Sequence, residues 1–174
     1  MIPSVLYLRI GTGNAIGAAN NSTVNGMAFN VPANIIGNGT DVAATAGSGD
    51  LGTGAVTVRV FSNVGGSVSL NSAVTGALGD GAGHSIAWSE ITVTEAALAS
   101  GTTGFTNAAI THPAFNTGAG GGNGTATTLT ATSGMVRREG QWTYTYSNTN
   151  VVPAGTYGGT PARNGRITYT AAQL

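Results

Sequence analysis

Apolar and polar residues alternate along eight short segments of this chain, which is the pattern of β-strands that bury one face. In the first segment, Leu6, Leu8 and Ile10 fall on one face of the predicted strand. Gly- and Asn-rich turns separate the segments. The eight predicted strands are Ser4–Ile10, Val24–Val31, Ala55–Ser62, Ser67–Asn71, Ile86–Thr94, Ala126–Thr132, Gly140–Ser147 and Arg166–Ala171.

The connections between these segments favour a purely β architecture. Only Glu95–Ser100 is compatible with one or two helical turns, and Asn63–Gly66 has the composition of a hairpin turn. Gly11–Thr23 and Gly101–Gly124 are rich in Gly, Asn and Thr and are predicted as long loops. We therefore expect one all-β domain: an immunoglobulin-like or pilin-like β-sandwich of about seven to nine strands with long Gly/Asn/Thr-rich loops.

The chain carries very few charges. Only 7% of its 174 residues are Asp, Glu, Lys or Arg, against roughly 25% in an ordinary soluble domain. All six basic residues are Arg and the net charge is zero. A surface of this kind favours self-association, so one interpretation is a subunit covered by copies of itself. The other is a compositional habit of secreted proteins, in which Thr, Asn and Ser replace charges.

Missing residue types exclude several kinds of chemistry. The absence of Cys excludes disulfides, thiol catalysis and Cys-based zinc sites, and the absence of Lys excludes a P-loop lysine or a Schiff base. A neutral chain without a basic patch is not expected to bind nucleic acid. No apolar run approaches the roughly 20 residues that span a bilayer, so we expect no membrane span.

Two motifs resemble catalytic or nucleotide-binding loops. Gly83–Ala87 (GHSIA) resembles a nucleophile elbow around Ser85, but a Gly-rich loop precedes it and a β pattern follows it, so we interpret it as a loop entering a strand. Gly11–Gly17 follows a strand as a dinucleotide loop would. Its spacing is Gly-x-Gly-x-x-x-Gly and the next residues do not favour a helix, so we interpret it as an ordinary loop.

The titratable residues form no recognisable site. His84 and His112 lack metal-ligand spacing, and His112 precedes Pro113, which favours an extended or loop position. The six acidic residues are scattered, without a calcium-loop pattern. A glycosidase needs two carboxylates across a cleft, and the sequence does not single out such a pair. We predict that the protein is not an enzyme, with no catalytic residue, cofactor or metal site.

Aromatic residues recur in the segment that begins at Gly140. Trp142, Tyr144 and Tyr146 share one face, which we interpret as the inward face of a central strand rather than a carbohydrate-stacking platform. Trp88 is also predicted in the core.

Polar motifs suggest two further interpretations. Asn-x-Ser/Thr sequences are candidate glycosylation acceptors. Rows of Thr suggest ice binding, but the rows in this chain do not repeat regularly as they do in ice-binding proteins. The predicted acceptors are Asn20, Asn21, Asn38 and Asn123. The Thr residues are Thr143, Thr145, Thr168 and Thr170.

The last quarter of the chain resembles a known kind of protein. Val151–Tyr157 (VVPAGTY) followed by Ile167–Thr170 (ITYT) is similar to the closing hairpin of secreted bacterial fimbrial subunits, the spore-coat-U-like and related pilin families. This resemblance implies donor-strand exchange, in which one subunit leaves a groove open and the terminal strand of the next subunit fills it. Repeated head to tail, such β-augmentation builds a filament.

The N-terminal segment is the predicted donor. We divide the chain into an N-terminal strand, residues 1–10, and a sandwich, residues 11–174. Leu6, Leu8 and Ile10 then insert into a neighbouring subunit; the alternative is that the same strand pairs within its own sandwich. The predicted interface residues are Val5, Leu6, Tyr7, Leu8 and Ile10.

We thus expect a structural subunit of an extracellular filament or surface assembly that polymerises with copies of itself, with surface glycans as a further partner. The alternatives are a secreted glycan-binding or adhesin module and a phage or capsid decoration protein. An extracellular or cell-surface location would follow removal of a signal peptide that this sequence does not contain.

Overall fold

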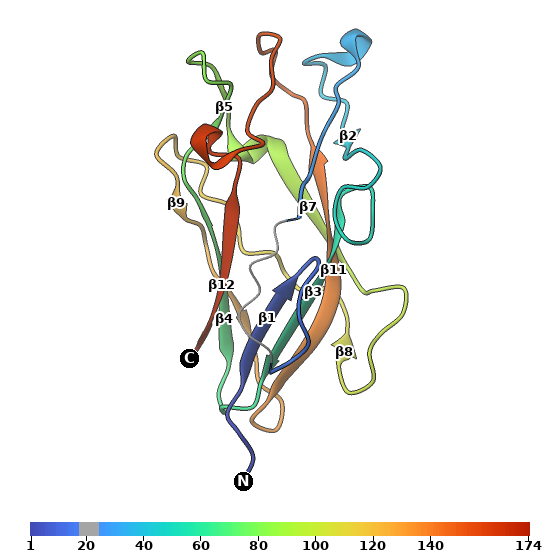
Figure 1. Ribbon diagram of the computed structural model, residues 1–174, viewed down its shortest axis with the longest axis vertical. Helices are drawn as coiled ribbons and strands as arrows, with labels where there is room; N and C mark the ends of the chain where they lie inside the picture. Colours follow the sequence, from blue (N-terminus) through green and yellow to red (C-terminus); the bar gives the residue numbers. More distant parts are fainter. Residues whose placement is uncertain (18–24) are drawn as a thin grey trace.

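The computed structural model describes residues 1–17 and 25–174. In that part of the chain the regular structure is β-strand, apart from three 3₁₀ helices of three residues: η1 (Ala33–Ile35), η2 (Trp88–Glu90) and η3 (Pro161–Arg163). The all-β prediction is confirmed, with mainly antiparallel sheets arranged as in a β-sandwich (Figure 1). The strands are β1 (Leu6–Ile10), β2 (Val42–Ala43), β3 (Ala55–Ser62), β4 (Val68–Val74), β5 (Leu78–Gly79), β6 (Ser85–Ile86), β7 (Ile91–Ala96), β8 (Thr106–Asn107), β9 (Gly122–Asn123), β10 (Thr127–Leu129), β11 (Val136–Tyr146) and β12 (Ile167–Gln173).

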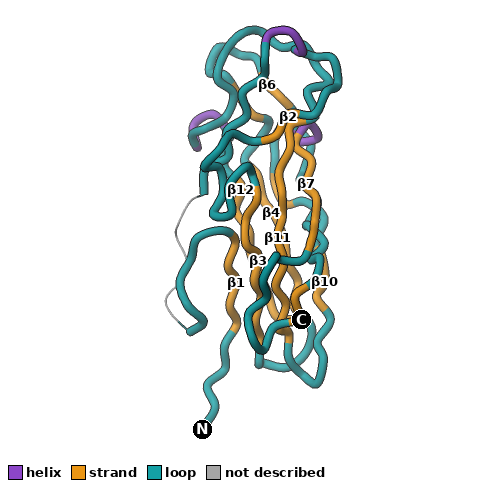
Figure 2. Tube along the Cα trace, turned by 90° about the vertical axis from the view of Figure 1, so that its right-hand side faces the viewer, coloured by secondary structure: helices purple, strands orange, loops and turns teal. Residues whose placement is uncertain are grey.

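The larger sheet is built around β11, which is 11 residues long. β3 pairs with one edge of β11, and β1 pairs with the outer edge of β3, so β1 ends the sheet on that side. The short strand β2 continues the β3 side of β11, whereas β7 and β8 lie along the opposite edge. Figure 2 shows β1 at one side of the elongated molecule.

The smaller sheet is built around β4. β12 runs antiparallel to β4 over all seven of its residues, and the short strands β9 and β10 occupy the other edge of β4. β5 and β6 form a separate pair near the upper end of the molecule, among the loops that gather there (Figure 1).

One core lies between the two sheets. The inward face of β3 contributes Val56, Val58 and Val60, and that of β4 contributes Val68 and Leu70, all at most 1% exposed. Burial of each such side chain contributes about 1.5–3 kcal/mol, so the period-two pattern of these strands is also their main source of stability.

The aromatic residues of β11 lie in the same core. Trp142 is fully buried and Tyr144 and Tyr146 are nearly so, which confirms their structural interpretation. Trp88 is also buried, and its indole N–H donates a hydrogen bond of 2.7 Å to the Gly76 carbonyl. None of these four rings therefore presents a surface for stacking on a carbohydrate.

Four local predictions were wrong. Asn63–Gly66 is not a hairpin turn, because β3 and β4 lie in different sheets. Glu95–Ser100 is not helical: its first two residues end β7 and pair with β11. The long strand expected over Ile86–Thr94 is interrupted by η2.

The fourth correction concerns the strand expected over Val24–Val31. Val24 lies outside the described residues, and the rest of the segment forms no strand. Its alternation is nevertheless real, because Met27, Phe29 and Val31 pack against the core while the residues between them are exposed. The segment has the side-chain pattern of a strand without its ladder of hydrogen bonds.

Candidate subunit interface

β1 pairs with β3 of its own sandwich, from Leu6 opposite Ser62 to Ile10 opposite Val58. The Gly11 N–H donates to the Thr57 carbonyl just beyond this ladder. In an antiparallel pair, alternate residues bond to the partner strand and the others direct their N–H and C=O groups away from it. Leu6, Leu8 and Ile10 are therefore the residues of β1 whose backbone faces its outer edge.

The side chains predicted to act as donor residues are unevenly buried. Leu8 and Ile10 pack against the core, whereas Leu6 is 39% exposed. The other two, Val5 and Tyr7, are half-buried on the opposite face. The isolated chain thus uses β1 to cover its own core, which is the arrangement that the sequence left open.

β12 is the matching edge of the smaller sheet. The Leu174 N–H donates to the Ser67 carbonyl at 2.9 Å, which fixes the alternation of the β4–β12 ladder. Ile167, Tyr169, Ala171 and Gln173 accordingly direct their backbone groups away from β4. Among the described residues no strand pairs with this edge. β1, in the other sheet, is in contact with β12.

The opposite side of the sandwich is closed by residues 108–115. Ile110 and Pro113 of this segment are buried, and the Trp142 indole N–H donates to the Ile110 carbonyl at 2.7 Å. The Ser72 hydroxyl donates to the carbonyl of Pro113. The segment also passes so close to β11 that a Cβ on Gly140 would lie 2.4 Å from the Ala108 carbonyl oxygen. This side is tightly sealed.

The side of the sandwich that lies between β1 and β12 is less densely packed with described residues. A cavity of about 720 Å³ lies there, beside the end of β1 and the beginning of β12. Leu8 and Ile10 line it from β1, and Ile167 and Tyr169 line it from β12. Residues 25–29 form one lip, the upper-end loops form the other, and no carboxylate lines it. We call this region the open side of the sandwich.

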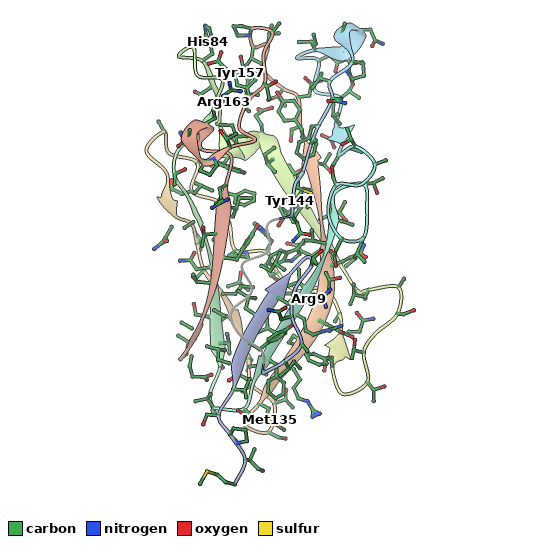
Figure 3. All side chains as sticks on the ribbon, viewed as in Figure 1. Arg9, His84, Met135, Tyr144, Tyr157 and Arg163 are labelled. Carbon is green, nitrogen blue, oxygen red and sulfur yellow. The ribbon has the colours of Figure 1, made fainter. Side chains whose placement is uncertain are left out.

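Aromatic residues form the wall between the cavity and the core. The hydroxyls of Tyr144 and Tyr169 are hydrogen-bonded at 2.7 Å, and the Tyr169 hydroxyl is 2.7 Å from Nε2 of His112. Burial raises the pKa of both tyrosines and lowers that of His112 from 6.5 to about 4, so all three groups are neutral at pH 7. Figure 3 shows Tyr144 in the middle of the molecule, between β12 and β11.

The chain turns sharply where β1 ends, and Asn25 holds this turn. Gly11 has a φ of +73°, and a Cβ there would lie 2.3 Å from the Asn25 side chain. The Asn25 carboxamide oxygen accepts hydrogen bonds from the N–H and the hydroxyl of Thr12, both at 3.2 Å, and its NH₂ group is 3.4 Å from the Ile10 carbonyl oxygen. The chain then folds back, since the Tyr7 hydroxyl donates to the Asn14 carbonyl.

Much of the sparse charge is used inside the molecule. Glu139 is fully buried and pairs with Arg59 at 2.8 Å, and Arg9 pairs with Asp50 at 3.5 Å. Glu90 is also buried, and it accepts hydrogen bonds from residues 149 and 150. The surface is therefore even poorer in charge than the composition suggests.

His84 and Ser85, the two residues of the elbow-like motif, are not hydrogen-bonded to each other in the described structure. Asp80 accepts hydrogen bonds from the His84 ring, at 2.7 Å, and from two backbone N–H groups, which lower its pKa to about 2. Ser85 is exposed in β6. His84 lies with Tyr157 and Arg163 at the upper end, far from Tyr144 (Figure 3).

The remaining predicted residues are dispersed. Asn38 and Asn123 are exposed, whereas Asn20 and Asn21 lie outside the described residues. The Thr pairs of β11 and β12 belong to different sheets and share no face. His112 lies in a segment without regular secondary structure, as the following Pro113 predicts, and its ring packs against Phe115 and Trp142.

The described residues also lack a metal-binding cluster and a membrane-spanning helix. In residues 1–17 and 25–174, no group of three or more acidic or His side chains is placed to hold a metal ion. The same residues include no helix with the length and apolar character needed to cross a membrane. Comparison with protein-family models, curated proteins and solved structures finds no match to this chain.

The sequence did not single out Asn25, Tyr169 or the cavity itself. Asn25 carries only the Asn-Gly signal of a turn, and Tyr169 only the alternation of a strand. Their roles depend on contacts with residues far away in the chain.

Proposed function

We propose that this protein is a structural subunit of an extracellular filament or surface assembly, and that neighbouring copies exchange their N-terminal strand β1. The observation that carries this proposal is that the open side of the sandwich is closed by an edge strand. Among the described residues β1 pairs only with β3, and it covers the core with Leu8 and Ile10. A strand held along one edge alone can be replaced by the same strand of another copy.

Exchange of β1 retains the contacts of the isolated chain. The incoming strand pairs with β3 in the same register and places the same two side chains against the core. Exchanging an identical element is a low-cost route to association, and a head-to-tail exchange that does not close on itself gives a filament. Backbone hydrogen bonds supply affinity and alternate side chains supply specificity.

The order of the strands supports the immunoglobulin-like part of the prediction. Across the larger sheet, the order β1-β3-β11-β7 matches the A-B-E-D order of that fold, and the paired strands β4 and β12 take the places of strands C and F. The position of strand G, beside β12, is then without a strand in the described residues. An edge without a strand in the described residues favours association with a neighbouring copy, as the resemblance to fimbrial subunits implies, beside the exchange of β1 onto β3.

The near-neutral surface also supports self-assembly. Only 7% of the residues are charged, and several of these lie inside the molecule. Free monomers with so little surface charge are prone to associate, whereas a subunit covered by its neighbours is not.

A reversible lock on β1 tests the proposal. Tyr7 and Phe61 are directly opposite each other in the β1–β3 ladder, and the native chain has no Cys. A disulfide between cysteines at these positions would hold β1 on its own sandwich. We expect the oxidised Tyr7→Cys/Phe61→Cys variant to stay monomeric in negative-stain electron microscopy, and to form fibres after reduction.

A second cysteine pair is the matched control. Thr94 and Thr143 are opposite each other in the β7–β11 ladder, on strands that do not exchange. The oxidised Thr94→Cys/Thr143→Cys variant should form fibres like the native protein. Dispersed monomers of the native protein across pH and salt would overturn the proposal and favour a secreted glycan-binding module.

A further inference from the structure

The cavity on the open side lies where β1 would continue if the chain did not turn. β1 ends at Ile10, whose side chain lines the cavity, and the chain then turns at Gly11 and folds back. A strand supplied by another copy has to lead back to its own subunit, so its path after Ile10 differs from the path in the isolated chain. Among the described residues, this cavity is the open space that lies in the direction of the strand.

We propose that in the assembled state Gly11–Gly17 of the incoming copy runs through this cavity, and that the Asn25 side chain is the clamp that prevents this in the isolated chain. This inference rests on the proposed function. It adds the path of the connecting segment and the contact that controls the exchange.

The composition of Gly11–Gly17 fits the cavity. The segment is uncharged and consists mainly of small residues, and the cavity lining is mostly apolar or neutral, with Arg166 as the charged residue among the described lining residues. Seven extended residues span at most about 25 Å, enough to pass from the end of β1 toward the upper loops. Ile16, which is 41% exposed in the isolated chain, would gain apolar contacts with the lining residues Met27 and Leu78.

The free edge of β12 offers hydrogen-bond partners to the same segment. Ile167 and Tyr169 line the cavity, and their backbone N–H and C=O groups point away from β4. An extended backbone beside them can form the main-chain hydrogen bonds that an added strand uses.

The clamp consists of the contacts that Asn25 makes with the turn. Its side chain bonds to Thr12 and approaches the Ile10 carbonyl oxygen, and it lies against Gly11 too closely for any Cβ there. Extension of the chain after Ile10 must break these contacts. The lifetime of the self-complemented form therefore depends on Asn25 and on the absence of a side chain at Gly11.

Two substitutions test the clamp through the rate of assembly. Asn25→Ala removes its hydrogen bonds, and Gly11→Ala strains the turn. We expect each to speed the exchange of fluorescently labelled subunits by about tenfold or more, while fibres keep their appearance. Gly134→Ala is the matched control, because Gly134 has nearly the same φ (+74°), nothing lies within 4 Å of its added Cβ, and it lies outside both Gly11–Gly17 and the cavity lining. It should leave the rate near that of the native protein.

A photo-crosslink tests the path. A benzophenone amino acid replaces Ile16, and fibres are grown from mixtures of this variant and ¹⁵N-labelled native chains, so that mass spectrometry distinguishes crosslinks between chains. We expect inter-chain crosslinks to cavity-lining residues such as Met27 and Leu78. Native fibres with unchanged exchange rates in both variants, or crosslinks outside the cavity, would overturn this inference and leave the proposed function standing. If native chains form no fibres, the proposed function itself fails.

Discussion

Protonation of the buried His112 ring is expected to destabilise the fold in a defined pH range. The ring packs against Phe115 and Trp142, with centroids 4.6 Å from each, and its Nε2 is hydrogen-bonded to the Tyr169 hydroxyl. Burial lowers its pKa from 6.5 to about 4. In the unfolded chain the imidazole recovers its ordinary pKa, so between pH 6.5 and 4 the unfolded state binds more protons.

The size of the effect follows from this difference in pKa. One pKa unit corresponds to 1.36 kcal/mol, so the free energy of unfolding should fall by about 3 kcal/mol as the pH is lowered from 6.5 to 4. The stabilisation that comes from the neutral His112 ring is fully present above pH 6.5. Asp80 affects stability in a separate pH range, because its pKa is lowered to about 2. The stabilisation from its ionised carboxylate is fully present above pH 3.8 and is lost as the pH falls toward 2.

Urea unfolding followed by tryptophan fluorescence at pH 7.5, 5.5 and 4.5 measures how the free energy of unfolding changes with pH. The oxidised Tyr7→Cys/Phe61→Cys variant is used, because it stays monomeric. His112→Gln lowers stability at pH 7.5 but should remove most of the slope between pH 6.5 and 4.5, because its side chain does not titrate. The same measurement on His84→Gln, at the exposed second histidine, separates any effect of that residue from the effect of His112. Equal slopes in the native and His112→Gln proteins would refute the assignment of a buried, neutral His112.

Two further predictions concern packing and charge. Gly140→Ala should lower the free energy of unfolding by about 1–3 kcal/mol, because the new methyl group meets the backbone of residues 96 and 108. Gly120→Ala has open space around its new methyl group and should have little effect in the same denaturation assay. Glu139→Gln should lower the free energy of unfolding by about 3 kcal/mol, because Arg59 and the loop at Thr102 lose their buried partner. Asp41→Asn, at an exposed position, should change the free energy of unfolding by less than about 0.5 kcal/mol. Native-like stability of either principal variant would contradict the corresponding contact.

Local sequence patterns predicted the strands well where the period of two alone decides the structure. Val56, Val58 and Val60 alternate with polar neighbours and are buried in β3 as expected, and the aromatic face of β11 is buried for the same reason. The pattern did not decide which sheet a strand joins. Asn63–Gly66 therefore looked like a hairpin turn, although it connects the two sheets.

The parts of the site that were not predicted depend on distant contacts. Met27 and Phe29 alternate like strand residues, but the segment forms no ladder, because its backbone bonds only sparsely to the loop at residues 45–49. The loop or extended position of His112 was predicted from Pro113, but the packing of its ring against Phe115 and Trp142 was not, because it depends on how residues 108–115 cross the core. The candidate donor residues were recognised from alternation, whereas the Asn25 clamp and the cavity required the fold.

The most direct test of strand exchange uses two proteins with one cysteine each. Tyr7→Cys and Phe61→Cys chains are mixed, assembled and oxidised, so that a disulfide between the two variants forms only if β1 of one chain lies on β3 of another. We expect disulfide-linked heterodimers in the assembled fraction and none in the monomeric fraction. Fibres that form without this crosslink would show that the copies associate without exchanging β1, and would contradict the account.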